Sequence, residues 1–337
     1  MGRRRVIFRK SETRLPKWLD DLIFRELGAS WNPSPADAEH NLYSDDGRVR
    51  EYLGTYFPRS YAEAFCIAEN LFQNEIIRST LSINEINILD IGCGTGGEIL
   101  GLLSAMDSYI SPSAVIHVCA CDGNSTALQY MNKAVGAFAL RSGRAVSVDA
   151  ICHKARSDTG LLYMERQVRQ VRFDFILCCK TCGELRSRGV SGSPYLSAAE
   201  KFSGLLKEDG LMLILDLTNK PEGCDEYLPV EMNRELNEFA RLHEEFAALL
   251  PKPCGAYPEC ECSCYIQQRF LISHSEMKND LSKVCYRIIC RRALRDRLVP
   301  DSVLEERQVI YPWDDDGYEI CRYSGGRRKS DAFNLNS

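Results

Sequence analysis

The chain has 337 residues and a formal net charge of −5, with 45% hydrophobic and 26% charged residues. This balance is typical of a globular protein and excludes a disordered chain or one that binds polyanions through bulk positive charge. No apolar run reaches the length of a membrane span, and no secretory signal follows the start. We therefore expect a soluble protein without a membrane partner, and we expect a monomer in the cytoplasm.

Two helical segments are expected before the first buried strand. Apolar residues recur between Trp18 and Leu27, after a basic start at Arg3-Arg4-Arg5. The aromatic stretch Tyr52–Tyr61 leads into a second helix over Ala62–Ile77, whose apolar spacing gives one buried face.

The stretch Ile86–Gly97 organises the rest of the chain. Its apolar run ends at Asp90 and a glycine-rich turn, and Glu98 then starts a helix. A buried strand that leads through a tight turn into a helix is the cofactor cradle of open α/β sheets. Two cofactor patterns fit the turn: a dinucleotide pattern (Gly92, Gly94, Gly97), and an Asp-x-Gly-x-Gly-x-Gly pattern that resembles class I S-adenosylmethionine methyltransferases (Asp90, Gly92, Gly94, Gly96).

Asp90 favours the methyltransferase pattern. A carboxylate repels a pyrophosphate, whereas it suits the ammonium and sulfonium of S-adenosylmethionine. Asp122 ends the next predicted strand, where an acidic side chain can accept both ribose hydroxyls. The cofactor residues expected from these patterns are Asp90, Gly92, Cys93, Gly94, Gly96 and Asp122.

Further strands follow the glycine-rich turn, and they predict an α/β fold with a Rossmann-like sheet. They are expected over Val115–Cys121, Ala145–Ile151, Phe173–Cys179 and Leu211–Leu217, with a linker and one helix over 220–250 and a closing hairpin of Val284–Cys290 and Tyr318–Tyr323. The turn Lys180–Leu185 follows the fourth strand, where methyltransferases carry substrate-side residues. Glu184 is its one obvious general base, although it could instead orient the helix start.

Cysteines are concentrated in a Pro/Gly-rich segment before the expected closing hairpin. Cys254, Cys260, Cys262 and Cys264 lie within eleven residues, and the chain has 16 cysteines in all. Thiolates this close suit a zinc ion or an iron–sulfur cluster, since both take four soft ligands. The Cys-x-Cys-x-Cys spacing is not that of a zinc ribbon, so three local ligands plus one distant cysteine is an open alternative, as is a loop of unligated thiols.

Four stretches together resemble the Rsm-type methyltransferase-like proteins of the small ribosomal subunit, found in bacteria and as mitochondrial ribosome assembly factors. They are Tyr56–Ala62, Asp90–Gly96, Cys182–Leu185 and Cys264–Arg269. Two departures stand out: Tyr265 replaces a histidine of the family, and Asp216-Leu-Thr replaces Glu-Pro-Gly. The resemblance implies a class I S-adenosylmethionine methyltransferase fold with N-terminal helices and a Cys-rich insertion.

The resemblance also implies a [4Fe–4S] cluster held by Cys254, Cys260, Cys264 and Cys321, with Cys262, Cys285 or Cys290 as alternatives to the last ligand. It predicts four regions: 1–80 helical, 81–220 cofactor-binding, 221–283 a helix and the Cys-rich insertion, and 284–337 the hairpin and a basic tail. The implied partner is small-subunit rRNA or a pre-ribosome, and the resemblance makes the mitochondrial matrix the alternative to the cytoplasm.

Three functions remain open from the sequence. The first is a methyltransferase-like protein that acts on, or assembles with, small-subunit rRNA. The second is a non-catalytic assembly factor that only binds cofactor and RNA. The third is a small-molecule or protein methyltransferase with a structural zinc. The sequence leaves open which atom would be methylated.

Overall fold

The computed structural model describes residues 11–33, 45–81, 84–155, 158–189, 191–252, 254, 265–299, 307–312, 319–323 and 333–335. The chain divides into two compact units. The N-terminal unit comprises Lys10–Phe173 and Phe270–Ser282, and the C-terminal unit comprises Asp174–Arg269 and Lys283–Ser337. Within the described ranges, no helix combines the length and apolarity needed to cross a bilayer.

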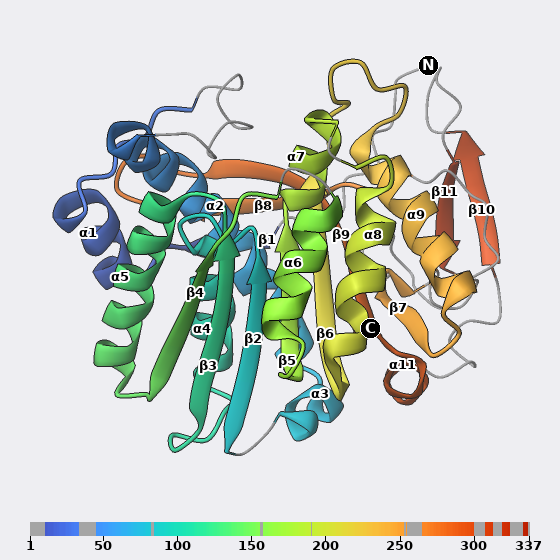
Figure 1. The fold of residues 1–337 in the computed structure, drawn as a ribbon, viewed down its shortest axis with the longest axis horizontal. Coiled ribbons are helices and arrows are strands. Elements are labelled where there is room, and N and C mark those ends of the chain that lie inside the picture. Colours follow the sequence, from blue (N-terminus) through green and yellow to red (C-terminus); the bar gives the residue numbers. More distant parts are fainter. Residues whose placement is uncertain are drawn as a thin grey trace. The chain divides into compact units, whose positions relative to one another are not determined.

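The N-terminal unit is built on a β-α-β-α-β arrangement. Strands β2, β3 and β4 lie side by side and pair in parallel, with Leu89 opposite Cys119 and Cys119 opposite Asp149 (Figure 1). Helices α4 and α5 make the two crossovers. The bounds are α1 Lys17–Asp21, a π-helical turn Leu22–Glu26, α2 Asp46–Phe72, α3 Glu75–Thr80, β2 Glu85–Ile91, α4 Gly97–Met106, β3 Val115–Asp122, α5 Ser125–Ser142, β4 Val146–Cys152 and α6 Asp158–Val168.

Burial and helix capping explain why strand β2 and helix α5 form where they do. Strand β2 is buried over Ile86–Ile91, as expected for a strand covered on both faces. Asn124 caps α5 by accepting hydrogen bonds from the amides of Thr126 and Ala127, at 2.9 and 3.2 Å, and Gly143 ends the helix in a left-handed conformation. The α/β fold class and the first three core strands predicted from the sequence are confirmed.

Helix α2 is longer than the sequence predicts. Asp45 caps it by accepting the Arg48 amide at 2.9 Å, so the aromatic stretch expected to precede the helix lies inside it. Pro58 also lies inside α2, although proline usually ends a helix because it removes one backbone hydrogen bond. The predicted start at Ala62 is therefore wrong. Tertiary packing against α4 offsets the local preference.

Two glycines allow α2 and α4 to approach closely. A methyl group added at Gly97 would lie 2.7 Å from the Phe57 carbonyl oxygen, and one added at Gly101 would lie 2.5 Å from that of Tyr61. Real side-chain carbons do not approach backbone atoms so closely. Hydrogen at these two positions is thus a condition for the packing of the helices.

A parallel strand pair completes the N-terminal unit. Strand β1 (Ser11–Arg14) pairs with β8 (Gln268–Ser273), with Ser11 opposite Phe270 and Arg14 opposite Ser273. The Leu15 amide extends this pairing by donating to the Ser273 carbonyl at 3.0 Å. Neither strand is among those that the sequence predicts.

The C-terminal unit contains the remaining strands and helices. Strand β6 pairs with β5 on one side and antiparallel with β9 on the other, with Ile214 opposite Arg287. Its elements are β5 Phe173–Cys179, α7 Thr181–Ser187, α8 Pro194–Phe202, a short 3₁₀ turn Ser203–Leu205, β6 Leu206–Leu217, α9 Leu228–Leu242, β7 Phe246–Leu250, the greater part of β9 Asp280–Arg291, α11 Arg292–Leu298, β10 Arg307–Pro312 and β11 Glu319–Tyr323.

Three predictions about this unit are corrected. Phe246–Leu250 is strand β7, antiparallel to β9, and not a continuation of the helix. Val284–Cys290 is a strand, as predicted, and forms part of β9, but its predicted pairing in a closing hairpin is wrong, because β11 pairs with β10 in a separate two-stranded sheet. Strand β6 begins at Leu206, five residues before the predicted start at Leu211. The four-region division of the chain stays a prediction.

The α2–α4 contact yields a stability prediction. Gly101→Ala should lower the free energy of unfolding by about 1–3 kcal/mol, because its methyl group overlaps the backbone of α2. Gly136→Ala, in α5 with open space around it, should raise the free energy of unfolding by up to about 1 kcal/mol through helix propensity. Urea denaturation of both variants measures the two signs. Equal stabilisation by both would contradict the close packing.

Candidate functional site

The glycine-rich turn between β2 and α4, residues 92–96, is held against the end of β3. The amides of Gly92 and Cys93 both donate to the Cys121 carbonyl, at 2.7 and 3.1 Å. Gly92, Gly94 and Gly96 have φ angles of +75°, +49° and +86°. At Gly96 an added side chain would also lie 2.5 Å from Cγ of Met131, so conformation and space both require glycine there.

Asp122 ties this turn to the end of strand β3. Its Oδ2 accepts the amide of Gly94 at 2.8 Å, and its Oδ1 accepts the amide of Asn124 at 2.7 Å. The residue is 9% exposed, and burial raises the pKa of its carboxyl although hydrogen bonds from the backbone of Asn124, Gly94 and Gly123 oppose that shift. A carboxylate has about four acceptor positions, so further hydroxyl donors can be accommodated.

Asp90 and Cys93 are two further buried side chains at the turn. Asp90 is 1% exposed and lies near the end of β2, where it is opposite Ala120 of β3 in the parallel pairing of the two strands. Burial, followed by the negative charges of Asp122 and Asp90, raises the pKa of the Cys93 thiol well above its usual value. Cys93 is therefore an uncharged thiol that suits an apolar contact. All six predicted cofactor residues lie on this turn or at the adjoining strand ends.

Tyr52 is a residue of this site that sequence reasoning missed. A methyl group added at Gly94 would lie 3.6 and 3.7 Å from its Cε1 and hydroxyl oxygen, so the half-buried tyrosine lies against the turn. The signal was present in the aromatic stretch of the sequence. It went unused because the helix was predicted to start at Ala62.

A second polar cluster surrounds the turn between β5 and α7 in the C-terminal unit. Lys180 adopts a left-handed conformation (φ 62°) and donates its amide to the Leu215 carbonyl at 2.6 Å. The predicted general base, Glu184, is half-buried in the first turn of α7. Gly183 donates its amide to Oδ2 of Asp216 at 2.6 Å, and an added methyl group there would overlap that carboxylate.

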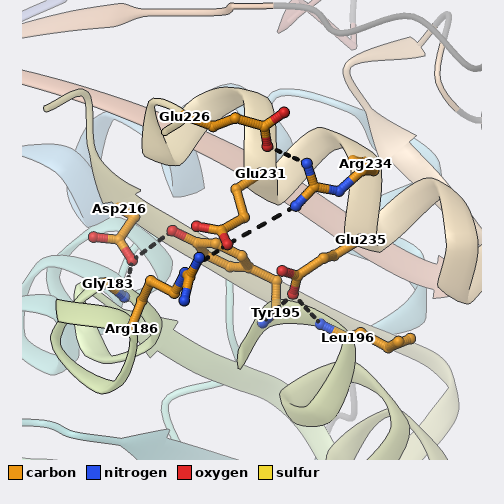
Figure 2. Close-up of polar contacts among 9 residues, drawn as sticks. All are labelled: Gly183, Arg186, Tyr195, Leu196, Asp216, Glu226, Glu231, Arg234 and Glu235. Atoms are coloured by element: carbon orange, nitrogen blue, oxygen red, sulfur yellow. Dashed lines mark hydrogen bonds and ion pairs between the residues drawn. The ribbon is translucent and has the colours of Figure 1, made fainter. Parts of the chain in front are cut away.

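Asp216 anchors this cluster from the end of β6 (Figure 2). It is 1% exposed and also accepts a hydrogen bond from the Tyr195 hydroxyl at 3.1 Å. Burial raises the pKa of Asp216 to about 6, because the three hydrogen bonds it accepts, including one from the Leu217 amide, only partly offset the loss of water.

Two glutamates of α9 contact the neighbouring helices α7 and α8 (Figure 2). Oε2 of Glu235 accepts the amides of Tyr195 and Leu196 at 2.8 and 3.0 Å, and thus caps the start of α8. Oε1 of Glu231 accepts from Nε of Arg186 at 2.7 Å, and this ion pair joins α9 to α7. Burial raises the pKa of Glu235 to about 7. No sequence motif pointed to Glu231 or Glu235.

The predicted cluster ligands lie mostly outside the described residues. Cys254 is described: it is half-buried, and its Sγ lies 3.6 Å from Oδ1 of Asn233. Cys260, Cys262 and Cys264 fall outside the described ranges, and of Cys321 only the backbone in β11 is described. Among the residues that the structure describes, no three metal-binding side chains come together.

The two alternative ligands on β9 are buried thiols. Burial raises the pKa of the Cys290 thiol to about 12 and that of Cys285 further. A metal ligand is a thiolate, so ligation at either position would have to release the proton of a buried thiol. Sγ of Cys285 lies 3.6 Å from the Asp216 carbonyl oxygen, which suits a neutral thiol donor.

Comparisons with known proteins give only distant likenesses. No family model matches the sequence, and no curated protein matches it. Among solved structures, the chain resembles the plantazolicin methyltransferase BpumL in complex with SAH (14% identity, TM-score 0.38, 69% of this chain and 80% of that one). It also resembles an O-methyltransferase from Bacillus cereus in complex with SAH (10% identity, TM-score 0.38, 81% and 90%).

A third likeness covers less. It is to a structure from Staphylococcus aureus named for caffeoyl-CoA O-methyltransferase activity, with 20% identity and a TM-score of 0.25. The chain spans about half of that protein's length, with 38% of this chain and 48% of the other covered. All three TM-scores are below 0.5, so the functional assignment depends on the residues of the site itself.

The buried carboxyl groups of Glu235 and Asp216 predict a pH-dependent stability. The folded pKa values of Glu235 (about 7) and Asp216 (about 6) exceed the usual values near 4, so the folded state binds more protons than the unfolded state. The free energy of unfolding should therefore fall between about pH 4 and pH 7. Glu235→Gln should remove part of that fall, up to about 3 kcal/mol.

Urea denaturation across this pH range measures the effect. Glu238→Gln is the matched control, since Glu238 lies on the same helix but is exposed. We expect the control to keep the pH profile of the unaltered chain. A Glu235→Gln profile that remains parallel to it would contradict the buried-carboxylate interpretation.

Proposed function

We propose that this chain is an S-adenosylmethionine-dependent methyltransferase. The observation that carries the proposal is the Asp122 carboxylate, which holds the Gly94 amide of the glycine-rich turn at 2.8 Å while it lies buried at the end of β3. A strand, a glycine-rich turn and a helix with a carboxylate at the next strand end form a cradle for a ligand with a ribose.

The chemistry of the donor set fits this cofactor. Two buried carboxylates, Asp90 and Asp122, flank the turn. They suit the ammonium, the sulfonium and the ribose hydroxyls of S-adenosylmethionine, whereas they would repel the pyrophosphate of a dinucleotide. In the proposal Asp90 and the turn hold the methionine end, and Asp122 accepts the ribose hydroxyls. The bound cofactor supplies an electrophilic methyl group.

Glu184 is the proposed general base for an acceptor that must lose a proton. It lies in the first turn of α7, whose position is fixed by the hydrogen bond from Gly183 to Asp216. A half-buried carboxylate can exchange protons with water. Positioning of the acceptor provides most of the rate in methyl transfer, so Glu184→Gln is expected to reduce the rate and not to abolish cofactor binding.

The cofactor proposal predicts a binding defect. Asp122→Asn should weaken binding of S-adenosylhomocysteine by about tenfold or more, because an amide cannot both accept from Gly94 and receive two ribose hydroxyls. Isothermal titration calorimetry measures the dissociation constants. Asp149→Asn, an exposed carboxylate on the neighbouring strand β4, is the control and should bind normally. No binding by the unaltered chain would refute the proposal.

Small-subunit rRNA or a pre-ribosome is the proposed target, with a [4Fe–4S] cluster on Cys254, Cys260, Cys264 and Cys321. This part of the proposal is supported by the sequence resemblance and by the soft-ligand chemistry of the thiols in the Cys-rich segment. Cofactor binding without methyl transfer to any RNA would favour the non-catalytic assembly factor.

The metal content of the protein tests the cluster. Anaerobically purified chain should contain about four irons and four acid-labile sulfides, and Cys264→Ser should lose them. Elemental analysis beside a sulfide assay measures both. One zinc and no iron would replace the cluster by a structural zinc and favour a methyltransferase of small molecules or proteins. A protein that contains neither iron nor zinc would refute a metal site in this segment.

A further inference from the structure

A line of planar side chains runs along α2 from the glycine-rich turn. Tyr52 lies against Gly94, and its ring centroid is 4.8 Å from that of Tyr56, with the rings tilted by 43°. The guanidinium carbon of Arg59 lies 5.8 Å from the centre of the Tyr56 ring. The spacing of four and then three residues places all three on one face of the helix. Each is half-buried, and we call them the α2 platform.

The platform is anchored at its Arg59 end. Nε and Nη2 of Arg59 donate to the two carboxylate oxygens of Asp280, each at 2.8 Å, in a bidentate pair. The Asp280 side chain is 4% exposed and that of Arg59 22%. The helix that carries the platform is also held at its first residue, because the hydroxyl of Tyr130 donates to Oδ1 of Asp46 at 2.8 Å.

The charge of the platform selects among ligands. Asp280 neutralises Arg59, so the guanidinium offers a planar face and hydrogen-bonding edges but little net charge. Arg50 forms an exposed ion pair with Asp46, at 3.0 Å, and the chain as a whole carries −5. Phosphate attraction is therefore weak here. Aromatic rings with an arginine plane are instead suited to stacking against a nucleobase.

We propose that the α2 platform binds an unstacked nucleobase of single-stranded RNA beside the cofactor turn. The inference deepens the proposed function, on which it rests, by naming the substrate class and the residues that recognise it. Tyr52 contacts the turn and the platform begins there, so a base on the platform lies close to where the proposed cofactor binds. Tyr56 is the central member, in contact with both neighbours.

RNA binding by the full chain tests the platform. The probe is a fluorescein-labelled single-stranded RNA of mixed sequence, measured by fluorescence anisotropy. Tyr56→Ala should weaken binding by about 5- to 100-fold, and Tyr56→Phe should keep affinity within about twofold, because stacking needs the ring and not the hydroxyl. Tyr163→Ala is the matched control, since Tyr163 is an exposed tyrosine of the same unit that stacks on His153.

A salt titration separates stacking from charge. The slope of the logarithm of affinity against the logarithm of salt concentration should be shallow and the same in Tyr56→Ala as in the unaltered chain. Ultraviolet crosslinking should place the RNA on the peptide that contains Tyr52 and Tyr56. Unchanged affinity in Tyr56→Ala, or an equal loss in Tyr163→Ala, would overturn the proposal.

Titration of S-adenosylhomocysteine separates this failure from that of the proposed function. Tyr56→Ala should bind it with the same affinity as the unaltered chain, which also shows that the variant is folded. Loss of S-adenosylhomocysteine binding in Tyr56→Ala would make the platform part of the cofactor site and overturn the inference. S-adenosylhomocysteine binding with no RNA binding by the unaltered chain would refute the platform and the rRNA target, and it would leave the cofactor proposal standing.

Discussion

A buried carboxylate that accepts backbone amides from a neighbouring segment is the interaction on which the candidate site depends. In the N-terminal unit, Asp122 accepts from Gly94 in the glycine-rich turn and from Asn124 at the start of α5. One side chain thus fixes a turn that has three left-handed glycines. Burial makes the bonds strong, because no water competes for the donors.

The C-terminal unit uses the same device. Asp216 ends β6 and accepts the Gly183 amide in the first turn of α7, just as Asp122 accepts an amide from the turn after its neighbouring strand. The consequence differs. Asp216 lies deeper, and its pKa rises to about 6, so the carboxylate is costly to keep ionised. The Tyr195 hydroxyl donates to Asp216, and Glu235 caps the start of α8, the helix that carries Tyr195 (Figure 2).

Helix α2 links fold to function in the N-terminal unit. Its packing on α4 requires glycine at positions 97 and 101, and that packing brings Tyr52 onto the glycine-rich turn. The helix continues through Pro58 because these contacts outweigh one missing backbone hydrogen bond. The same continuation sets Tyr52, Tyr56 and Arg59 on one face. A helix that started at Ala62 would leave them in a loop with no common surface.

The sequence by itself determined the α/β class, the first core strands and the position of the glycine-rich turn. Strands with buried faces and turns that need glycine leave local signals: apolar runs, Asp90 and Asp122 at strand ends, and glycine at left-handed positions. The turn Lys180–Leu185 was located in the same way, from its place directly after a buried strand.

Tertiary structure alone decided which distant groups meet. Strand β11 pairs with β10 and not with Val284–Cys290, since pairing depends on non-local geometry that a short apolar pattern does not encode. The contacts of Glu235 with Tyr195, and of Arg59 with Asp280 over a separation of 221 residues, have no sequence signature. A carboxylate or guanidinium finds such partners only after packing removes it from water and makes an unmet hydrogen bond costly.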